Sequence, residues 1–362
     1  MAFELFSPSD QVARHLRDEI LKGRWRREVS GTPALSEELG VDRKTVTAAL
    51  NLLQKEGLLA SQGPGKPRLV AKPANSKTTR LTIRFMPYDG DDHQLAHCMG
   101  LISRIKAMGH HIEMDSLTLK GSHMNLQKIK KHVRKHPADA WILHAASREI
   151  LEWFKEKDIP VIAVFGRRRQ VQVASIGPDK VSAMRACVRR LCELGHRRIV
   201  LMAREERRRP VPGYIELEFL EELKKNGIEP GPYHLPGWND NPKGFHQCLD
   251  ELFRHTPPTA LILVETHFYV AAMQHLIQKG LCVPQDVSLA CSESHPVFNW
   301  CQPSVSHIHW EADPIIKHVV KWVRKLSRGI NDKECCYTPA VFLEGGSIGP
   351  VNSQVNSMAI SI

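Results

Sequence analysis

The chain has 362 residues, which is long enough for two domains with large buried cores. Its 50 Lys and Arg against 39 Asp and Glu give a formal net charge of +11, and this basic balance favours a polyanionic partner. No signal peptide or long apolar span is recognisable, and the nine cysteines form no CxxC pair. We therefore expect a cytoplasmic protein with reduced thiols rather than a membrane or exported protein.

The N-terminal segment predicts three helices. Residues 10–25 place Val12, Leu16 and Ile20 on one helical face. Residues 35–59 predict two further short helices, joined by a sharp turn at Gly40 and Val41. Asp42 is expected to cap the second of these helices, where a carboxylate accepts a free amide at the positive end of the dipole. The core-facing stripe of that helix consists of Val46, Ala49, Leu50 and Leu53.

The opposite face of the same helix carries side chains that can reach phosphates and base edges from the major groove. They are Arg43, Lys44, Thr47, Asn51 and Gln54. The alternative is an ordinary helical hairpin whose polar face is only solvated. The chain after Gly57 favours DNA binding, because two short apolar runs flank the Gly-Pro-Gly-Lys turn at 63–66 and predict a β-hairpin wing with a basic tip.

Residues 8–70 resemble the winged helix-turn-helix of the GntR regulators. The resemblance rests on Gly23, Pro33, Arg-Lys-Thr-Val at 43–46, Glu-Gly-Leu at 56–58 and the glycine-rich turn. We assign residues 1–70 to this DNA-binding domain, with contacts to DNA from Arg43, Lys44, Thr45, Thr47, Gly65 and Lys66. Ala-Leu-Ser at 34–36 departs from the family's usual Ser-Glu-Arg after the proline, so a different site preference is expected.

A linker is predicted at residues 71–80, which lack apolar periodicity and carry proline, small and charged residues. Residues 1–73 hold 12 Lys and Arg against 9 Asp and Glu, so most of the net positive charge lies beyond the DNA-binding segment. Residues 167–169 and the run 204–209 carry much of it. Solvated loops near strand ends are the simpler explanation for both runs.

From residue 81 onward, short apolar runs alternate with amphipathic helices, a pattern that predicts parallel, doubly wound α/β sheets. The expected strands of a first set are 81–86, 139–145 and 159–166, and those of a second set are 197–203, 259–265 and 287–291. Two sets of similar size indicate two lobes. Ligands of such sheets sit at the carboxyl ends of the strands, so both lobes should present loops to a common cleft.

Residues 80–345 resemble the effector domain of the LacI/GalR regulators, a relative of periplasmic sugar-binding proteins. The most specific pieces are Leu-Gly-His-Arg at 194–197, Pro-Thr-Ala at 258–260, and Val283-Pro284 leading to Asp-Val-Ser at 286–288. A GntR-type head on this type of body is similar in layout to arabinose-responsive repressors. The resemblance implies an effector-binding and dimerisation domain at 81–345.

The resemblance also implies the extent of each lobe. Lobe one would span 81–195 and 309–328, and lobe two 197–307 and 335–345, with crossovers near His196, residues 307–309 and residues 328–331. Three hinge segments permit lobe closure without breaking either core. Residues 346–362 would form a C-terminal tail.

The expected effector contacts come from two sources. The resemblance places Asp179 in the pocket, and it places Trp238 there as an aromatic that can stack on a sugar ring. Strand ends and aligned loops add Tyr88, Asp89, His144, Glu265, Glu293 and Arg209. The paired carboxylates and amides that grip vicinal hydroxyls in sugar-binding relatives are only partly present. A sugar or sugar acid is therefore the suggested ligand class, without a named compound.

Metal and cofactor sites are not expected. His93 with His97 and His132 with His136 have the i, i+4 spacing of helical metal ligands, but neither pair has an obvious third ligand. The Asp-Gly-Asp-Asp loop at 89–92 lacks calcium-loop spacing and is better explained as a solvated turn.

These features favour a ligand-responsive transcription regulator, a repressor, that binds a palindromic operator as a homodimer. A solute-binding receptor without catalytic activity is the alternative, since it would share the two lobes. An enzyme is not expected, because the sequence contains no nucleophile elbow, P-loop or HExxH motif.

Overall fold

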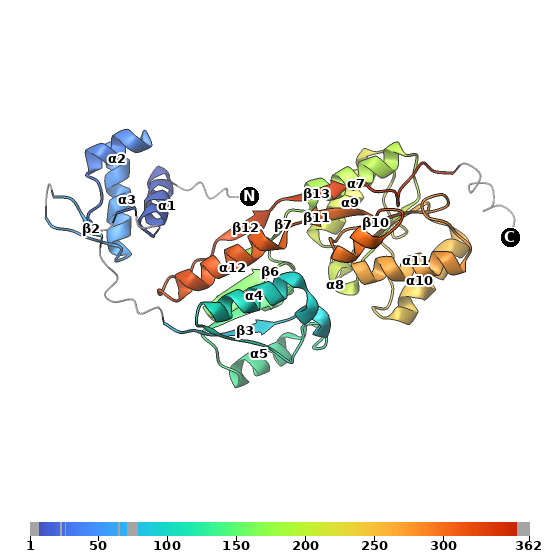
Figure 1. Ribbon diagram of the computed structural model, residues 1–362, viewed down its shortest axis with the longest axis horizontal. Helices are drawn as coiled ribbons and strands as arrows, with labels where there is room; N and C mark the ends of the chain where they lie inside the picture. The colour runs from blue at the N-terminus through green and yellow to red at the C-terminus, as the bar shows by residue number, and fades with distance from the viewer. Residues whose placement is uncertain (1–6, 22–23, 26, 64–65, 71–78, 353–362) are drawn as a thin grey trace. The chain divides into compact units, whose positions relative to one another are not determined.

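The computed structural model of the protein describes residues 7–21, 24–25, 27–63, 66–70 and 79–352. The chain divides into two compact units, residues 1–79 and 80–362, and Figure 1 labels the elements of both. Within the described ranges, none of the helices combines the length and the apolar character that crossing a bilayer requires.

The predicted helix-turn-helix is confirmed in the first unit. Its helices are α1 (Pro8–Leu21), α2 (Thr32–Leu39) and α3 (Arg43–Lys55). Gly40 ends α2 in the left-handed conformation, with a φ of 64°, which glycine adopts at little cost. The Asp42 carboxylate caps α3 by accepting from the backbone N–H groups of Lys44 at 2.8 Å and Thr45 at 2.9 Å. The core of this unit includes the fully buried Leu16, Leu35, Val46 and Leu53.

The predicted wing is a short antiparallel ladder. Strand β1 (Leu59–Ala60) pairs with β2 (Leu69–Val70), and Glu28 bridges Leu69. Gly65 at the predicted wing tip lies outside the described residues, as do residues 71–78 of the predicted linker.

The first lobe of the second unit is a six-stranded parallel sheet in the order β12-β7-β6-β5-β3-β4. Its strands are β3 (Thr82–Met86), β4 (His111–Met114), β5 (Ala140–His144), β6 (Val161–Val164), β7 (Ala174–Pro178) and β12 (Cys335–Thr338). Its helices are η1 (Gly90–Gln94), α4 (Ala96–Ala107), α5 (Leu126–Lys135), α6 (Arg148–Glu156) and α12 (Ala312–Leu326).

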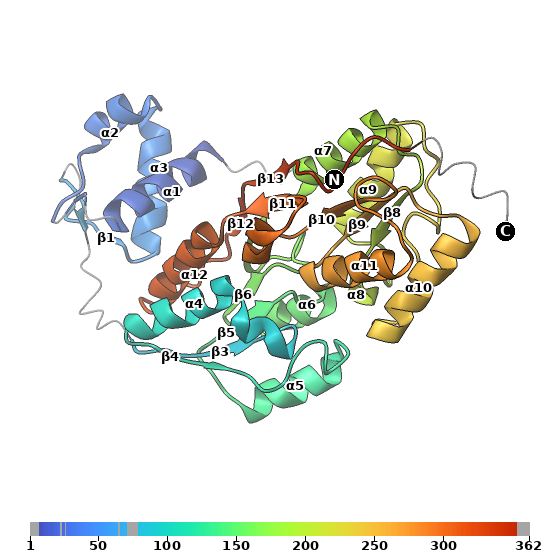
Figure 2. The same ribbon diagram turned by 45° about the vertical axis from the view of Figure 1, so that its right-hand side comes forward.

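Both faces of this sheet are covered. Ile83 and Phe85 of β3 pack in one core with α4 and α12, which lie side by side (Figure 2), whereas Met86 packs in another core with α5 and α6. Burial on both faces explains why the strands appear in the sequence as continuous apolar runs. The predicted doubly wound sheet is thereby confirmed.

The second lobe holds a five-stranded sheet in the order β13-β11-β10-β9-β8, parallel except for β13. Its strands are β8 (Ile199–Met202), β9 (Ala260–Leu263), β10 (Ser288–Cys291), β11 (Ser306–Trp310) and β13 (Ala340–Leu343). Its helices are α7 (Val181–Glu193), α8 (Glu205–Arg208), α9 (Tyr214–Lys225), α10 (Pro242–His255), α11 (Thr266–Gln278) and η2 (Pro296–Trp300).

The lobe boundaries expected from the sequence need correction at two elements. Helix α7 belongs to the second lobe, because its apolar stripe packs into the core of the second sheet and the helix lies against α9. Strand β12 belongs to the first lobe, because it pairs with β7. The chain therefore crosses between lobes at 178–181, 310–312 and 338–340, and not near His196 or residues 328–331.

The segment expected to begin a C-terminal tail at residue 346 is packed on the second lobe. Ser347 accepts a hydrogen bond from the Leu289 backbone N–H at 2.8 Å, and Ile348 is only 6% exposed in the lobe core. Val351 donates to the Leu194 carbonyl oxygen at 2.9 Å. Residues 346–351 are therefore part of the second lobe and do not form a tail.

Candidate functional site

The polar face of α3 lies at the surface of the first unit. Arg43, Lys44 and Thr47 are exposed there, and the Thr47 hydroxyl donates to the Arg43 carbonyl oxygen at 2.7 Å. Thr45 is half-buried, and its hydroxyl donates to Asp42 at 2.6 Å. That bond and the capping N–H groups hold the pKa of Asp42 below its usual value. Thr45 therefore stabilises the start of the helix, in addition to any role in binding.

The wing contributes an arginine that sequence reasoning did not select. Arg68 donates to the Asn51 side-chain oxygen at 2.5 Å and to the Gln54 side-chain oxygen at 3.3 Å, so it lies across the polar face of α3. Lys66, the predicted wing-tip contact, is exposed two residues earlier. The signal in the sequence was a basic residue two positions after Lys66, at the end of the predicted wing turn.

A cavity of about 2720 Å³ lies between the two lobes of the second unit. Ligand pockets usually measure about 300–1,000 Å³, so this volume is that of a cleft in which a small molecule would occupy one part. Six of the eight expected effector contacts line it: Tyr88, Asp89, His144, Arg209, Glu265 and Glu293.

Asp179 and Trp238, the two expected contacts carried over from the resemblance, do not line the cavity. The Asp179 carboxylate accepts from Arg169 at 3.3 Å and from the Val181 backbone N–H at 3.4 Å, at the first crossover. Trp238 is 8% exposed and packs edge-on against Phe245 and Phe268. Its ring therefore belongs to the core of the second lobe, and a stacked sugar has no access to it.

One polar cluster joins the lobes across the cavity. Arg204, two residues after β8, places its guanidinium carbon 3.7 Å from the centroid of the Tyr88 ring, which follows β3 in the first lobe. Arg204 also forms an ion pair of 3.0 Å with Glu265. Burial opposes the charge on Arg204, but Glu265 together with Tyr88, Glu206 and Asp240 outweighs it and keeps the pKa of Arg204 above its usual value. Burial likewise raises the pKa of Tyr88.

A second cluster uses both carboxylate oxygens of Glu293. One accepts from Lys180 Nζ at 2.5 Å and the other from the Trp310 indole N–H at 3.1 Å. Lys180 also donates to the Ser292 carbonyl oxygen at 2.9 Å. Glu293 therefore lines the cavity with both carboxylate oxygens already bonded. Sequence reasoning selected Asp179 and missed its neighbour Lys180, which is more deeply buried than Glu293.

A third cluster is a clamp between the lobes. Arg167 of the first lobe donates to three backbone carbonyl oxygens of the second: those of Glu206 at 2.9 Å, Arg209 at 3.0 Å and Val211 at 2.7 Å. Burial lowers the pKa of Arg167. The explanation of the arginine runs as solvated loops is wrong for Arg167 and Arg204, since both are held in interlobe contacts.

His144 ends β5 at the cavity wall and meets His97 of α4, with 3.0 Å between their Nε2 atoms. The sequence had paired His97 with His93 instead. His93 is exposed and bonds the Gly90 carbonyl oxygen through Nδ1.

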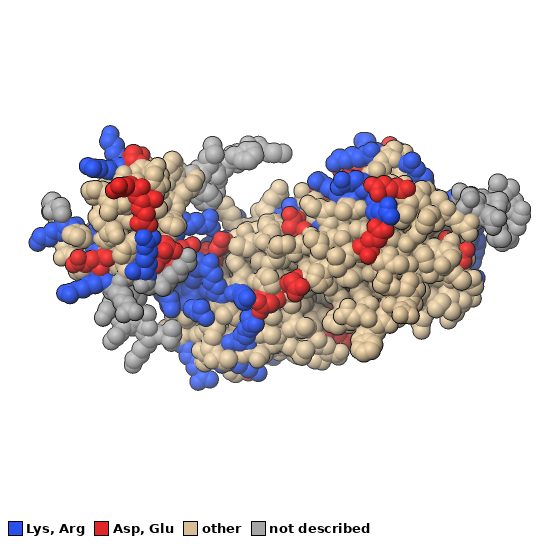
Figure 3. Space-filling model, turned by 45° about the horizontal axis from the view of Figure 1, so that its top comes forward, with Lys and Arg blue, Asp and Glu red and all other residues tan. Residues whose placement is uncertain are grey.

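On the molecular surface, Lys and Arg form several separate patches on the face shown in Figure 3, rather than one continuous stripe.

Two family models match the chain. Residues 8–65 match bacterial regulatory proteins of the gntR family, and residues 188–348 match the periplasmic binding protein-like domain. The chain joins a GntR-type helix-turn-helix domain to a periplasmic-binding-protein-like domain. The first match lies in the unit with the exposed α3 face, and the second covers the second unit from within α7 to residue 348.

Known proteins with similar sequences include the HTH-type transcriptional regulator MalR of Streptomyces coelicolor, 26% identical over 179 residues, which are 46% of this chain and 50% of MalR. The chain aligns with half or less of the length of the curated relatives it matches.

Solved structures with the same fold include a LacI family transcriptional regulator from Enterococcus faecium with bound ribose. It has a TM-score of 0.60 and 16% identity, and covers 75% of this chain and 100% of its own. The lac repressor dimer bound to operator and the anti-inducer ONPF has a TM-score of 0.60 and 15% identity, over 76% of this chain and 96% of its own. At these identities the likeness concerns the fold.

Proposed function

We propose that the protein is a ligand-responsive transcription regulator that binds a palindromic operator as a homodimer and represses transcription there. The observation that carries the proposal is the exposed polar face of α3, with Arg68 of the wing laid across it, in a GntR-type domain. A helix of this kind reads base edges from the major groove, while basic side chains around it contact phosphates. Such a protein works where the chromosome is, in the cytoplasm.

The proposed DNA contacts are Arg43, Lys44, Thr47 and Lys66, joined by Arg68, Thr45 and Gly65. Arg43 and Lys44 begin α3, where the N-terminal residues of a recognition helix approach the bases. One winged helix presents a small surface, whereas two heads related by a two-fold axis read an inverted repeat with higher affinity. The lac repressor, a protein of the same body fold, is bound to its operator as a dimer.

The proposed effector is a small polyhydroxyl molecule, a sugar or sugar acid, held in the interlobe cavity. Tyr88, Asp89, His144, Glu265 and Arg209 supply hydroxyl, carboxylate, imidazole and guanidinium groups from both lobes. The Enterococcus faecium regulator of the same fold holds ribose. A ligand that contacts both lobes binds the closed form better than the open form, which is the requirement for shifting a conformational equilibrium.

A solute-binding receptor would share the lobes and the cavity but would have no use for the α3 surface. We propose no catalytic role, since the relatives that the chain matches are named as transcription regulators.

The test is selection of DNA by the full chain. Duplexes with a randomised core are incubated with the protein, bound duplexes are amplified over several rounds, and the enriched sequences are read. We expect an inverted repeat, with affinity that changes on addition of a sugar found by thermal-shift screening. Retention of all duplexes alike, at an affinity set only by salt concentration, would contradict a sequence-specific regulator.

A further inference from the structure

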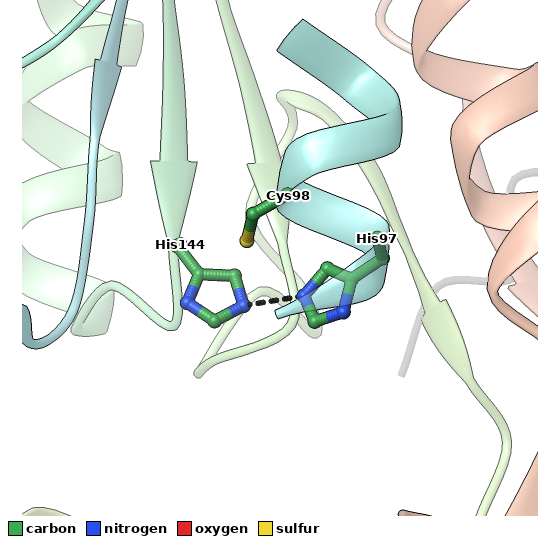
Figure 4. A group of neighbouring side chains, drawn as sticks. All are labelled: His97, Cys98 and His144. Carbon is green, nitrogen blue, oxygen red and sulfur yellow. Dashed lines mark hydrogen bonds between the residues drawn. The ribbon is translucent and has the colours of Figure 1, made fainter. Parts of the chain in front are cut away.

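Two buried histidines converge at the cavity wall of the first lobe (Figure 4). His97 lies in the first turn of α4, His144 lies at the C-terminal end of β5, and their Nε2 atoms are 3.0 Å apart. Each is less than a tenth exposed. The Cys98 side chain, fully buried, points to the same place, and the donor atoms of the three residues all lie within 4.8 Å of one another.

Asp92 fixes the orientation of His144. Its Oδ2 lies 2.6 Å from His144 Nδ1 and also accepts from the Tyr88 backbone N–H at 2.7 Å. The carboxylate holds the imidazole proton on Nδ1, which leaves Nε2 as the nitrogen with a free lone pair. A carboxylate behind an imidazole is the usual support of a metal-binding histidine, because it fixes the tautomer and the ring orientation.

The surroundings of His97 disfavour a charged imidazole. Its ring centroid lies 5.2 Å from that of Phe165 and 5.6 Å from that of Trp310, both in edge-on contact. In the metal-free protein, a single N–H on His97 Nε2 can join the two imidazoles. When that proton resides on Nδ1 of His97 instead, both Nε2 atoms offer lone pairs to a common ion, without a change in the charge of either ring.

The distances are close to those of a tetrahedral site. Zn–N bonds of about 2.0–2.1 Å and a Zn–S bond of about 2.3 Å place two nitrogens about 3.3 Å apart and a nitrogen and a sulfur about 3.6 Å apart. The imidazoles therefore need to separate by only about 0.3 Å. The sulfur, within 4.8 Å of its partner nitrogens, needs to approach by at most about 1.2 Å.

We propose that His97, His144 and Cys98 form a binding site for a transition-metal ion of the zinc class, with its fourth position open to the cavity. Two imidazoles and a thiolate suit borderline and soft ions such as Zn²⁺, whereas Mg²⁺ and Ca²⁺ require oxygen ligands. His97 and His144 line the cavity and Cys98 does not, so the open position faces the cavity. On binding, the Cys98 thiol loses its proton to solvent and the thiolate sulfur bonds the ion. The site does not depend on the proposed regulatory function.

The test uses Co²⁺ as a spectroscopic probe on the full chain, after removal of metals with a chelator under reducing conditions. We expect saturation at one Co²⁺ per chain, with visible absorption of tetrahedral Co²⁺ and a near-ultraviolet thiolate-to-cobalt charge-transfer band, both displaced by one equivalent of Zn²⁺. The Cys98→Ser variant is the most conservative change and should lose the charge-transfer band. His97→Gln and His144→Gln should each weaken Co²⁺ binding at least tenfold.

Two variants serve as matched controls. His93→Gln removes an exposed histidine from the preceding turn, and His132→Gln removes one member of the i, i+4 pair on α5. Both should leave the Co²⁺ spectrum and stoichiometry unchanged. The other eight cysteines remain in Cys98→Ser, so a charge-transfer band that persists there would overturn the proposal. So would the absence of saturable binding, or binding that His132→Gln abolishes. If the histidine variants fail to fold, the Cys98→Ser spectrum decides alone.

Discussion

Tyr88 and Arg204 face each other across the interlobe cavity, with 3.7 Å between the guanidinium carbon and the centroid of the phenol ring. The two residues follow parallel strands of different sheets, β3 and β8, so their contact exists only while the lobes are close. Arg204 is tied to Glu265 on its own lobe. An effector that contacts these residues therefore acts on groups whose positions depend on closure, which is how differential affinity for the closed form arises.

The first prediction concerns this ion pair. Arg204→Met should lower the free energy of unfolding of the second unit by about 3 kcal/mol, because the largely buried Glu265 charge would keep only the exposed His267, at 3.5 Å, beside it. Arg204→Met combined with Glu265→Gln should recover at least half of the loss. Arg209→Ala is the control, since its side chain is 72% exposed and its ion pair with Glu205 should contribute under about 1 kcal/mol. Denaturant titration measures all four proteins, and equal losses in the single and double variants would show that Glu265 does not need Arg204.

The second prediction concerns the Arg167 clamp. Arg167→Ala removes hydrogen bonds to three carbonyl oxygens of the other lobe, so the ligand-free protein should populate more open forms. Small-angle X-ray scattering should show a larger radius of gyration. Arg148→Ala is matched in charge and size, but among the described residues Arg148 bonds only partners in its own lobe, the Arg169 carbonyl oxygen and the Gln170 side chain. An unchanged scattering curve for Arg167→Ala would mean that other contacts hold the lobes together.

Local patterns allowed the helix-turn-helix and most strands to be predicted, because they depend on neighbours in the chain. The spacing of Val46, Ala49, Leu50 and Leu53 defines a buried stripe, and Gly40 and Asp42 mark the turn and the cap. The stripe of α7 also predicts burial, but both sheets offer an equivalent apolar surface. Which sheet α7 covers depends on tertiary packing, and this is why the lobe boundary was misplaced.

Among the cavity residues, too, those marked by a local pattern were predictable, whereas those brought together by tertiary packing were not. His144 was predicted from its position at the end of a strand, and the same reasoning applied to β8 would have found Arg204. Trp238 was not recognisable as a core residue, because its partner Phe245 lies in the next helix, α10, and its partner Phe268 comes from the more distant α11, and only tertiary packing brings both onto the Trp238 ring. His97 meets His144 only through the packing of α4 on the sheet. A spacing of four residues suggested His93 as its partner instead.

The third prediction concerns DNA binding. Arg43→Ala should cost about 1–3 kcal/mol of operator binding and relax preference at one base position, if Arg43 reads a base. Lys44→Ala should weaken binding to all sequences alike and reduce the salt dependence by about one unit of slope, as expected for a phosphate contact. Fluorescence anisotropy on the selected operator and on a scrambled duplex, at several salt concentrations, separates these effects. Wild-type affinity of both variants for the operator would show that these residues of α3 do not contact the DNA.

Arg68 permits a more specific prediction about the same surface. Arg68→Ala should release Asn51 and Gln54 from its guanidinium, so their side chains become free to take other rotamers. We expect weaker operator binding and a broader base preference. Arg27→Ala should affect operator binding less, because it removes an exposed arginine from the segment before α2, whose Arg27 carbonyl oxygen accepts from the Val70 backbone N–H. A repeat of the DNA selection with each variant measures the preference directly. An identical enriched sequence for Arg68→Ala would show that the arginine is not needed to position the two amides.

The last prediction concerns pH and the docked C-terminal segment. His196 Nε2 lies 2.9 Å from the Gly349 carbonyl oxygen and 3.1 Å from the Ser288 hydroxyl, and burial lowers the pKa of His196 despite the Gly349 bond. Because its folded-state pKa lies below the unfolded value of about 6.5, protonation favours the unfolded chain, and stability should fall as the pH drops below that value. The slope from this one residue is at most about 1.4 kcal/mol per pH unit.

His196→Gln keeps a donor for Gly349 and cannot titrate, so its free energy of unfolding should decline less than that of the wild type between pH 7 and pH 5. His93→Gln, a change at an exposed histidine, should leave the wild-type pH dependence in place. If His196→Gln and the wild type lose stability in parallel, the acid sensitivity of the second lobe arises from other buried groups, such as His275, whose pKa is also lowered by burial.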